Sequence, residues 1–308
     1  MINTKIKNIL VLLDFSEASL NALETAIAIA KQQNSNIMLL NVADSSFIFG
    51  FKGVYYISEK TIDSIVDVSS RMLNSLLTTL KEKHQLNFTS EVKVGLVPHS
   101  IINTAADIDA DLIIMGTHGV SGFREFFIGS TAQKVVKISS CPVLTIPPNK
   151  KWLDFKKILF PVRPIKGVME KYDFLRKIIA NTNASMDILF LVPTYDEIEK
   201  KLLKHLVKDI KVKVINDQIR VSGTLKIGEN ISQAVLKRSK SIDADMIVIT
   251  AKIDAGFNQF FIGPFEQHIV NHATMPVLSI RPKLAKPDSQ VVIQQIHESF
   301  PAPISLFA

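Results

Sequence analysis

The feature that most constrains this chain is an internal repeat, because its second half is a diverged copy of its first. Four pairs of segments carry the repeat: KNILVLLDF at 7–15 with KKILFPVRP at 156–164, DADLIIMG at 109–116 with DADMIVIT at 243–250, GFREFFIG at 122–129 with GFNQFFIG at 256–263, and SSCPVLTIPP at 139–148 with HATMPVLSIRP at 272–282. With 308 residues, the chain is long enough for two domains of ordinary size. The repeat therefore predicts two domains of one fold.

The repeat divides the chain into three parts. We expect one domain over 1–149, a second over 150–283, and a C-terminal tail over 284–308 that has no counterpart in the first half. The boundary falls near Pro147 and Pro148, because two consecutive prolines interrupt regular structure. For the tail, packing on the body and disorder are both open alternatives.

Short apolar runs predict the strands of the first half. Ile9–Leu13 and Leu112–Met115 are unbroken, while Ile37–Val42 and Val143–Ile146 each contain a single polar residue. Such runs suit strands that are covered on both faces, as in a parallel sheet. Phe88–Val94 alternates more weakly and gives a fifth candidate strand.

Apolar residues at helical spacing fill the segments between these strands. The expected buried stripes are Leu20, Leu23, Ile27 and Ala30; Ile65, Met72, Leu76 and Leu80; Ile101, Ile102 and Ala105, after a helix start at Pro98; and Ala132, Val135 and Val136. The resulting order, βαβαβαβαβ, predicts an α/β fold in which a doubly wound, open parallel sheet of five strands has helices on both faces. The second half follows the same plan, with a shorter connection after its second strand.

The first and fourth predicted strands lead into the residues of greatest chemical interest. Ligands of doubly wound sheets bind beyond the carboxyl ends of the strands, where the strand order reverses. Asp14 ends the first strand, and Gly116 begins the glycine-rich segment GTHGVSGFREFFIGST that leads into a helix. Glycines let the backbone approach a ligand closely, and a helix start offers free N–H groups to a phosphate. A surface loop with Ser130 as a simple helix cap is the alternative, but the strand–loop–helix context favours a phosphate site.

The same segment carries a recognisable signature. GTHG at 116–119, followed after nine residues by Gly129 and Ser130, resembles the G-x2-G-x9-G-[ST] signature of ATP-binding universal stress proteins. DFSEASLNAL at 14–23 is similar to the opening of that family, and SSCPVLTIPP to its closing strand. The resemblance covers residues 5–148 well and 155–283 weakly.

That resemblance implies a strand order of 3-2-1-4-5, with ATP, with or without Mg²⁺, lying across the first and fourth strands. Asp14 would line the pocket at the ribose or at a metal-bound water, and the backbone of Val42 would meet the adenine. The glycines and hydroxyls of the motif would hold the phosphates, with His118 in a supporting role. The implied ATP-binding residues are Asp14, Val42, Met115, Gly116, His118, Gly119, Gly129, Ser130 and Thr131.

The resemblance also implies how the two halves meet. Dimers of this family pair their last strands, so Val143–Ile146 and Val277–Ile280 would pair within this one chain as a pseudo-dimer. Such pairing would hide both strand edges. A homodimer of the whole chain is a further expectation.

The second half departs from the signature at its key positions. The replacements are Asp14 by Arg163, Gly116 by Thr250, Gly119 by Ile253, and Ser130 by Pro264. Isoleucine strongly disfavours positive φ, and proline lacks a backbone N–H. We therefore interpret the second half as a structural or regulatory partner domain. An alternative is that Arg163, Lys166 and Lys252 line the same crevice and hold a different anion.

Charge and composition limit the partners and the compartment. The net charge is +7, but the first 150 residues hold 13 basic and 13 acidic residues, so the excess lies in the second half. We attribute it to solvated helix faces, and expect neither nucleic-acid nor membrane binding. The single cysteine, Cys141, excludes a disulfide framework, and no signal peptide or spanning apolar run is visible, so a cytoplasmic protein is expected. His268 and His272, four residues apart, lack an evident third metal ligand.

The sequence thus predicts a stress-response protein that binds ATP in its first half and signals by occupancy, rather than an enzyme. One alternative is a slow ATPase, or a protein that phosphorylates itself on Ser130 or Thr131. Another is a scaffold that binds no nucleotide and acts through its basic half. Asp14 is the one carboxylate expected at the crevice, which is too little for general acid–base hydrolysis without help.

Overall fold

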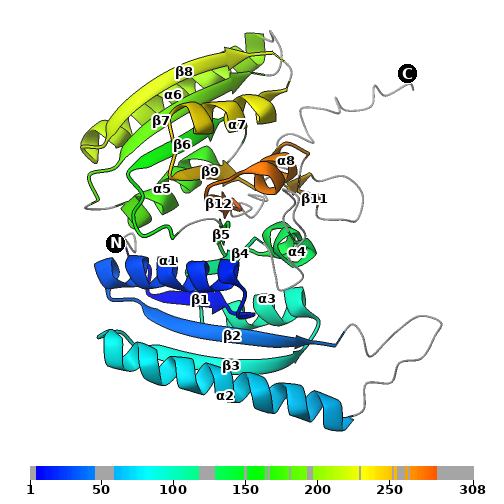
Figure 1. Ribbon diagram of the computed structural model, residues 1–308. Helices are drawn as coiled ribbons and strands as arrows, with labels where there is room; N and C mark the ends of the chain where they lie inside the picture. The colour runs from blue at the N-terminus through cyan, green and yellow to red at the C-terminus, as the bar shows by residue number, and fades with distance from the viewer. Residues whose placement is uncertain are drawn as a thin grey trace, which may run out of the picture.

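Ten strands form one continuous sheet across both halves of the chain, with helices on both of its faces (Figure 1). The computed structural model describes residues 5–45, 59–117, 129–148, 151–163, 165, 167–179, 182–192, 197–228, 230–251, 253–254, 261–262 and 264–282. The tail expected over 284–308 lies outside these residues. Within them, no helix combines the length and apolar character needed to cross a bilayer.

The elements alternate along the chain as the apolar pattern predicts. The strands are β1 (Asn8–Leu12), β2 (Asn36–Asp44), β3 (Phe88–Gly95), β4 (Leu112–Gly116), β5 (Val143–Ile146), β6 (Lys157–Val162), β7 (Ser185–Val192), β8 (Arg220–Ile227), β9 (Met246–Thr250), β10 (Ile253–Asp254), β11 (Phe261–Ile262) and β12 (Val277–Ile280). The helices are α1 (Glu17–Gln33), α2 (Glu59–Lys83), α3 (Val97–Asp107), α4 (Ser130–Ile138), α5 (Val168–Ile179), α6 (Glu197–Asn216), α7 (Ile231–Ser241) and α8 (Pro264–His272).

The strand order confirms the predicted fold class. Across the sheet the order is β3-β2-β1-β4-β5-β12-β9-β6-β7-β8, so each half has its own strands in the order 3-2-1-4-5. Neighbouring strands within each half are parallel. A separate two-stranded antiparallel ribbon, β10 with β11, belongs to the second half.

The two five-stranded sheets are joined by β5 and β12. These two strands pair antiparallel, with Leu144 opposite Leu278 and Thr145 opposite Val277. Both leucines are fully buried. The expected pairing of Val143–Ile146 with Val277–Ile280 is confirmed, and neither strand remains as an open edge.

Helix α1 shows how local sequence fixes an element beside the future site. Ser16 is its N-cap, and the Ser16 hydroxyl accepts a hydrogen bond from the backbone N–H of Ser19. Asn34 ends the helix in the left-handed conformation, with φ of 55°. The buried face is rich in alanine, including Ala22, Ala26 and Ala30, which lets the helix approach the sheet closely.

Two predicted helical stripes were wrong in part. In α1, Leu20 is 40% exposed, whereas Leu23, Ile27 and Ala30 are buried as predicted. In α2, Ile65 and Met72 are exposed although their spacing is helical, while Leu80 is buried as expected. The stripe of α4, from Ala132 to Val136, is buried as predicted.

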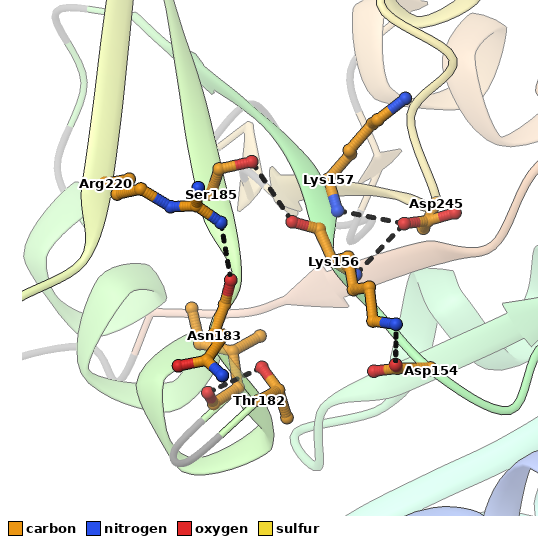
Figure 2. Close-up of polar contacts among 9 residues, drawn as sticks. Asp154, Lys156, Lys157, Thr182, Asn183, Ser185, Arg220 and Asp245 are labelled. Carbon is orange, nitrogen blue, oxygen red and sulfur yellow. Dashed lines mark hydrogen bonds and ion pairs between the residues drawn. The ribbon is translucent and has the colours of Figure 1, made fainter.

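The starts of the equivalent strands β1 and β6 are held in the same way in both halves. One carboxylate oxygen of Asp111 accepts the backbone N–H groups of residues 7 and 8, at 2.6 and 3.2 Å. The corresponding oxygen of Asp245 accepts those of residues 156 and 157, at 3.0 and 2.9 Å (Figure 2). The repeat therefore extends to the hydrogen bonds that position each first strand.

Candidate functional site

A pocket of about 260 Å³ lies at the carboxyl ends of β1, β2 and β4 in the first half. Small-molecule sites typically occupy roughly 300–1,000 Å³, so this volume lies near the lower end of that range. The described residues that line it are Leu12, Leu13, Asp14, Ser19, Leu40, Val42, Val97, Ile101, Met115, Gly116, Thr117, Gly129, Ser130, Thr131 and Ala132. Seven of the nine residues implied by the family resemblance are among them. The other two, His118 and Gly119, lie outside the described residues.

Asp14 stands at the rim of the pocket, at the end of β1. Its side chain is exposed, and one carboxylate oxygen accepts both the backbone N–H and the hydroxyl of Ser16, at 3.0 and 2.5 Å. Ser16 in turn caps α1, and Phe15 between them has a φ of 62°. The turn between strand and helix thus holds the negative charge of Asp14 in a defined place.

Gly116 ends β4 where α1 comes closest to the sheet. A Cβ atom at Gly116 would lie 2.8 Å from the Cβ of Ala18 and 2.9 Å from its carbonyl carbon. The sequence suggested that this glycine makes room for a ligand, but the structure shows that it makes room for the first turn of α1. The glycine therefore has a structural reason whether or not a ligand binds.

The opposite wall of the pocket is the start of α4. Gly129 is its N-cap and has no side chain to cap the helix, and its backbone N–H donates to the carbonyl of Thr117 at 2.6 Å. The N–H groups of a first turn have no acceptor within their own helix, and the helix dipole places partial positive charge there. Together with the Ser130 and Thr131 hydroxyls, this wall suits an anion such as a phosphate.

The pocket also has an apolar wall, which sequence reasoning mostly missed. Leu40 and Val42 contribute from β2, and Val97 and Ile101 from α3. Of these, only Val42 was predicted as a site residue. The others could have been found from their place in the chain, because residues at the carboxyl ends of strands and at the helix starts that follow share one edge of the sheet.

The ionisable content of the pocket is small. Among the described residues that line it, Asp14 alone has an ionisable side chain. Across the part of the chain that the structure describes, no three His, Cys, Asp or Glu side chains group in a way that could hold a metal ion. The pocket offers amides and hydroxyls to an anion, and these lining residues include no second acid–base group beside Asp14.

Comparisons with known proteins agree with this architecture. The sequence profile of the universal stress protein family matches residues 5–147 and 179–281. The chain belongs to the universal stress protein family. The universal stress protein YxiE of Bacillus subtilis is 31% identical over 142 residues, which are 44% of this chain and 96% of that protein. One from Methanocaldococcus jannaschii is 30% identical over 145 residues, or 47% of this chain and 84% of that one.

The tandem arrangement also occurs among solved structures. The crystal structure of a universal stress protein from Archaeoglobus fulgidus superposes with a TM-score of 0.73 and 17% identity, covering 91% of this chain and 98% of that one. At this identity the likeness concerns the fold alone. The two relatives above match about half of this chain over most of their own length. Each therefore corresponds to one half of the chain, in agreement with the repeat.

At the equivalent place in the second half, the residue that replaces Asp14 is paired within the chain. Arg163, which replaces Asp14, forms an ion pair of 2.8 Å with Glu266 and lies with its guanidinium carbon 4.5 Å from the centre of the Phe265 ring. Phe265 and Glu266 belong to α8 and correspond to Thr131 and Ala132. The alternative that Arg163 binds an external anion is therefore not supported, because Glu266 already occupies it. Lys166 and Lys252 lie outside the described residues.

The contact between the fourth strand and the first helix contains a glycine in both halves, but on the strand in the first half and before the helix in the second. Gly116 faces Ala18 in the first half, and their counterparts are Thr250 and Gly167. A Cβ at Gly167 would lie 3.3 Å from the methyl of Thr250 and 2.1 Å from the ring of Pro282. Gly167 thus faces Thr250, although its φ of 91° and the closer ring of Pro282 are stronger reasons for a glycine at this position.

Cys141, His268 and His272, which the sequence also singled out, are not among the described residues that line the pocket. The Cys141 thiol lies 3.1 Å from the carbonyl oxygen of Ala110, and burial, with a smaller effect of Asp111, raises the pKa of Cys141 to about 12. The His268 and His272 rings stack with centres 4.2 Å apart. Burial, and secondarily His272, lowers the pKa of His268.

Proposed function

We propose that the first half binds ATP in the pocket between β1, β2 and β4, and that the protein acts in the stress response through occupancy of this pocket. The observation that supports the proposal is that residues from distant parts of the sequence line one pocket. The described residues that the resemblance implies, scattered from Asp14 to Thr131 in the sequence, line one pocket that has a helix start on one wall and apolar side chains on another. The apolar wall suits a planar base, and the start of α4 suits phosphates.

The ionisable content of the pocket favours binding over catalysis. Hydrolysis by general acid–base chemistry requires positioned groups that exchange protons, and Asp14 alone is available among the described lining residues. With one carboxylate oxygen engaged by Ser16, Asp14 is suited to orient a ribose hydroxyl or a water on a bound Mg²⁺. We therefore assign the pocket a holding role.

The test is to identify the small molecules released from the freshly purified protein by mass spectrometry, and then to titrate the emptied protein with ATP by calorimetry. We expect an adenine nucleotide among the released molecules and micromolar affinity. The absence of measurable ATP binding would reject the proposal. Phosphorylation of Ser130 or Thr131 after incubation with ATP and Mg²⁺ would instead favour a self-phosphorylating enzyme.

A pair of variants at one position sharpens this test. S130P introduces the residue that begins α8 in the second half, and removes a backbone N–H together with the hydroxyl. S130A removes the hydroxyl alone and serves as the matched control. Proline is tolerated in the first turn of a helix, so both variants should fold. We expect S130P to weaken ATP binding by about tenfold to a hundredfold, because a hydrogen bond to a charged group contributes roughly 1.5–3 kcal/mol.

A further inference from the structure

The sheet ends in two outer strands, β3 in the first half and β8 in the second, and these strands differ in how far they are covered (Figure 1). In β3, which α2 covers, Phe88 is 1% exposed. Val221 takes the equivalent place in β8, because both strands pair with their neighbours in the same register. Val221 is 42% exposed, and Leu225, on the same face of β8, is 56% exposed. The outer strand of the second half thus leaves apolar side chains in solvent.

The placement of α6 accounts for this exposure. Helix α2 packs against β3, whereas α6 has its main contacts with α5 and β7. Lys213 of α6 pairs with Asp173 of α5 at 2.8 Å. The Asp217 carboxylate, just beyond α6, accepts a hydrogen bond from the Tyr172 hydroxyl of α5 at 2.7 Å. These contacts hold the carboxyl end of α6 beside α5, and one face of β8 stays exposed.

The outer edge of β8 presents backbone groups as well. Gly228, directly after β8, donates its N–H to the carbonyl oxygen of Val192 on β7 at 3.0 Å. Backbone groups point to alternate sides along a strand, so those of Val221, Gly223 and Leu225 point away from β7. Among the strands that the structure describes, none pairs with β8 on this side. The edge therefore offers N–H and C=O groups to an added strand.

The opposite face of β8 carries its charge. Arg220 and Lys226 share this face, with Ser222 and Thr224 between them, and both basic side chains are exposed. Arg220 also donates to the backbone carbonyl of Asn183 at 3.2 Å (Figure 2). Like charges on adjacent strands are destabilising, so a second copy of β8, which brings the same basic residues, is disfavoured. Acidic side chains are favoured in a strand that pairs here.

We propose that β8 binds an extended acidic segment of a partner protein as an additional strand of the sheet. Alternate side chains of this segment are apolar and cover Val221 and Leu225. The side chains between them are acidic and meet Arg220 and Lys226. Main-chain hydrogen bonds provide affinity, and the alternation of apolar and acidic residues provides specificity. The surface contains no residue of the pocket in the first half, so the inference holds whether or not ATP binds there.

The probe for this surface is a short fluorescein-labelled peptide in which valine and glutamate alternate. It is titrated with the full-length chain, and binding is followed by fluorescence anisotropy. The control is the same peptide with lysine in place of glutamate. We expect saturable binding of the acidic peptide and none of the basic one. Equal binding of both peptides, or binding of neither, would overturn the proposal.

Variants of β8 locate the binding on this strand. L225A removes an apolar side chain and should weaken binding of the acidic peptide about fivefold. L225P also removes an outward N–H and should weaken binding further. Proline is tolerated on an edge strand where the N–H faces solvent, so L225P should fold, and far-UV circular dichroism checks this. An affinity of L225A and L225P equal to that of the wild type would contradict docking on β8.

A change of charge tests the acidic character of the partner. K226E places a like charge opposite the glutamates and should weaken binding about tenfold. K60E makes the same change at an exposed position of α2 in the first half, and should leave the affinity unchanged. Equal affinities of K226E and K60E would overturn the proposal.

Two measurements test the other possible occupants of this edge. A synthetic peptide of residues 284–308 should not displace the probe, and displacement would assign the edge to the chain's own tail. Sedimentation velocity of the wild type and L225P should show the same oligomeric state for both. A dimer of the wild type that L225P dissociates would place a second copy on β8. Either of these results would overturn an external partner.

Discussion

The two crevices of this protein share a backbone plan and differ in what fills them. In the first half, Asp14 stands exposed at the rim of an open pocket, and the wall opposite ends in the small side chain of Ala132. In the second half, Arg163 is paired with the buried Glu266. The second half therefore did not simply lose the motif. Arg163 and Glu266 now form an ion pair with each other at the equivalent place.

We expect the largest loss of stability at β5 and β12, the pair of strands to which each half contributes one. L144A and L278A should each lower the free energy of unfolding by about 2–5 kcal/mol, because each leaves a cavity in the buried sheet. Since the two leucines lie opposite each other, the double variant should cost less than the sum. Urea unfolding of all four proteins measures this. Strictly additive losses would show that the leucines do not share one cavity.

The next effect is a pH dependence of stability that depends on the fully buried Lys171 in the second half. Because the folded protein lowers the pKa of Lys171 to about 7, the unfolded chain binds more protons between pH 7 and pH 10.5. Stability should therefore rise with pH across this window, by up to about 1.4 kcal/mol per pH unit. K171M should remove the rise, and K211M, on an exposed part of α6, should retain it. Urea midpoints at pH 7, 8 and 9 test this, and parallel curves for wild type and K171M would contradict it.

The strand–helix contact offers a smaller and sharper test of the comparison. G116A should lower stability by about 1–3 kcal/mol, because its methyl group meets the backbone of α1. Adding A18G reproduces the arrangement of the second half, where Gly167 faces Thr250, and should recover part of the loss. A double-mutant cycle by urea unfolding measures the coupling. Independent, additive effects would show that the residues on the two sides of this contact do not compensate for each other.

The smallest difference between the halves is expected at the strand starts. Asp111 and Asp245 each accept two backbone N–H groups through one oxygen. D111A and D245A should each cost about 1–3 kcal/mol, and the two costs should be similar, because the geometry is repeated. Chemical denaturation compares them directly. A large difference between the two losses of stability would show that these hydrogen bonds do not contribute equally in the two halves.

Much of the fold could be predicted because its signals are local. Unbroken apolar runs identified β1 and β4, and the repeat assigned the same plan to the second half. The strand order came from resemblance to a family rather than from the residues themselves. The stripes of α1 and α2 were harder, because helical spacing alone does not say which of several apolar faces meets the sheet, as exposed Leu20 and Ile65 show.

The candidate site was predictable in its polar part only. Glycines and hydroxyls next to a strand end are visible in the sequence, whereas the apolar wall from β2 and α3 depends on which segments the fold brings together. The ion pair of Arg163 with Glu266 joins residues 103 positions apart. Its signals in the sequence are an arginine where the first half has Asp14 and a glutamate where it has Ala132, and neither shows that the two side chains meet. The role of Gly116 needed the position of α1, which no local pattern contains.

The two halves that meet at β5 and β12 belong to one polypeptide, which gives them a freedom that separate subunits lack. In a symmetric homodimer every substitution appears twice, so a charge that closes one cleft closes both. In this protein a single polypeptide carries both lobes, so their ratio stays one to one at any dilution, and each lobe can accumulate its own changes. Fusion thereby allows one lobe to exchange Asp14 for an internally paired Arg163 while the other keeps an open pocket.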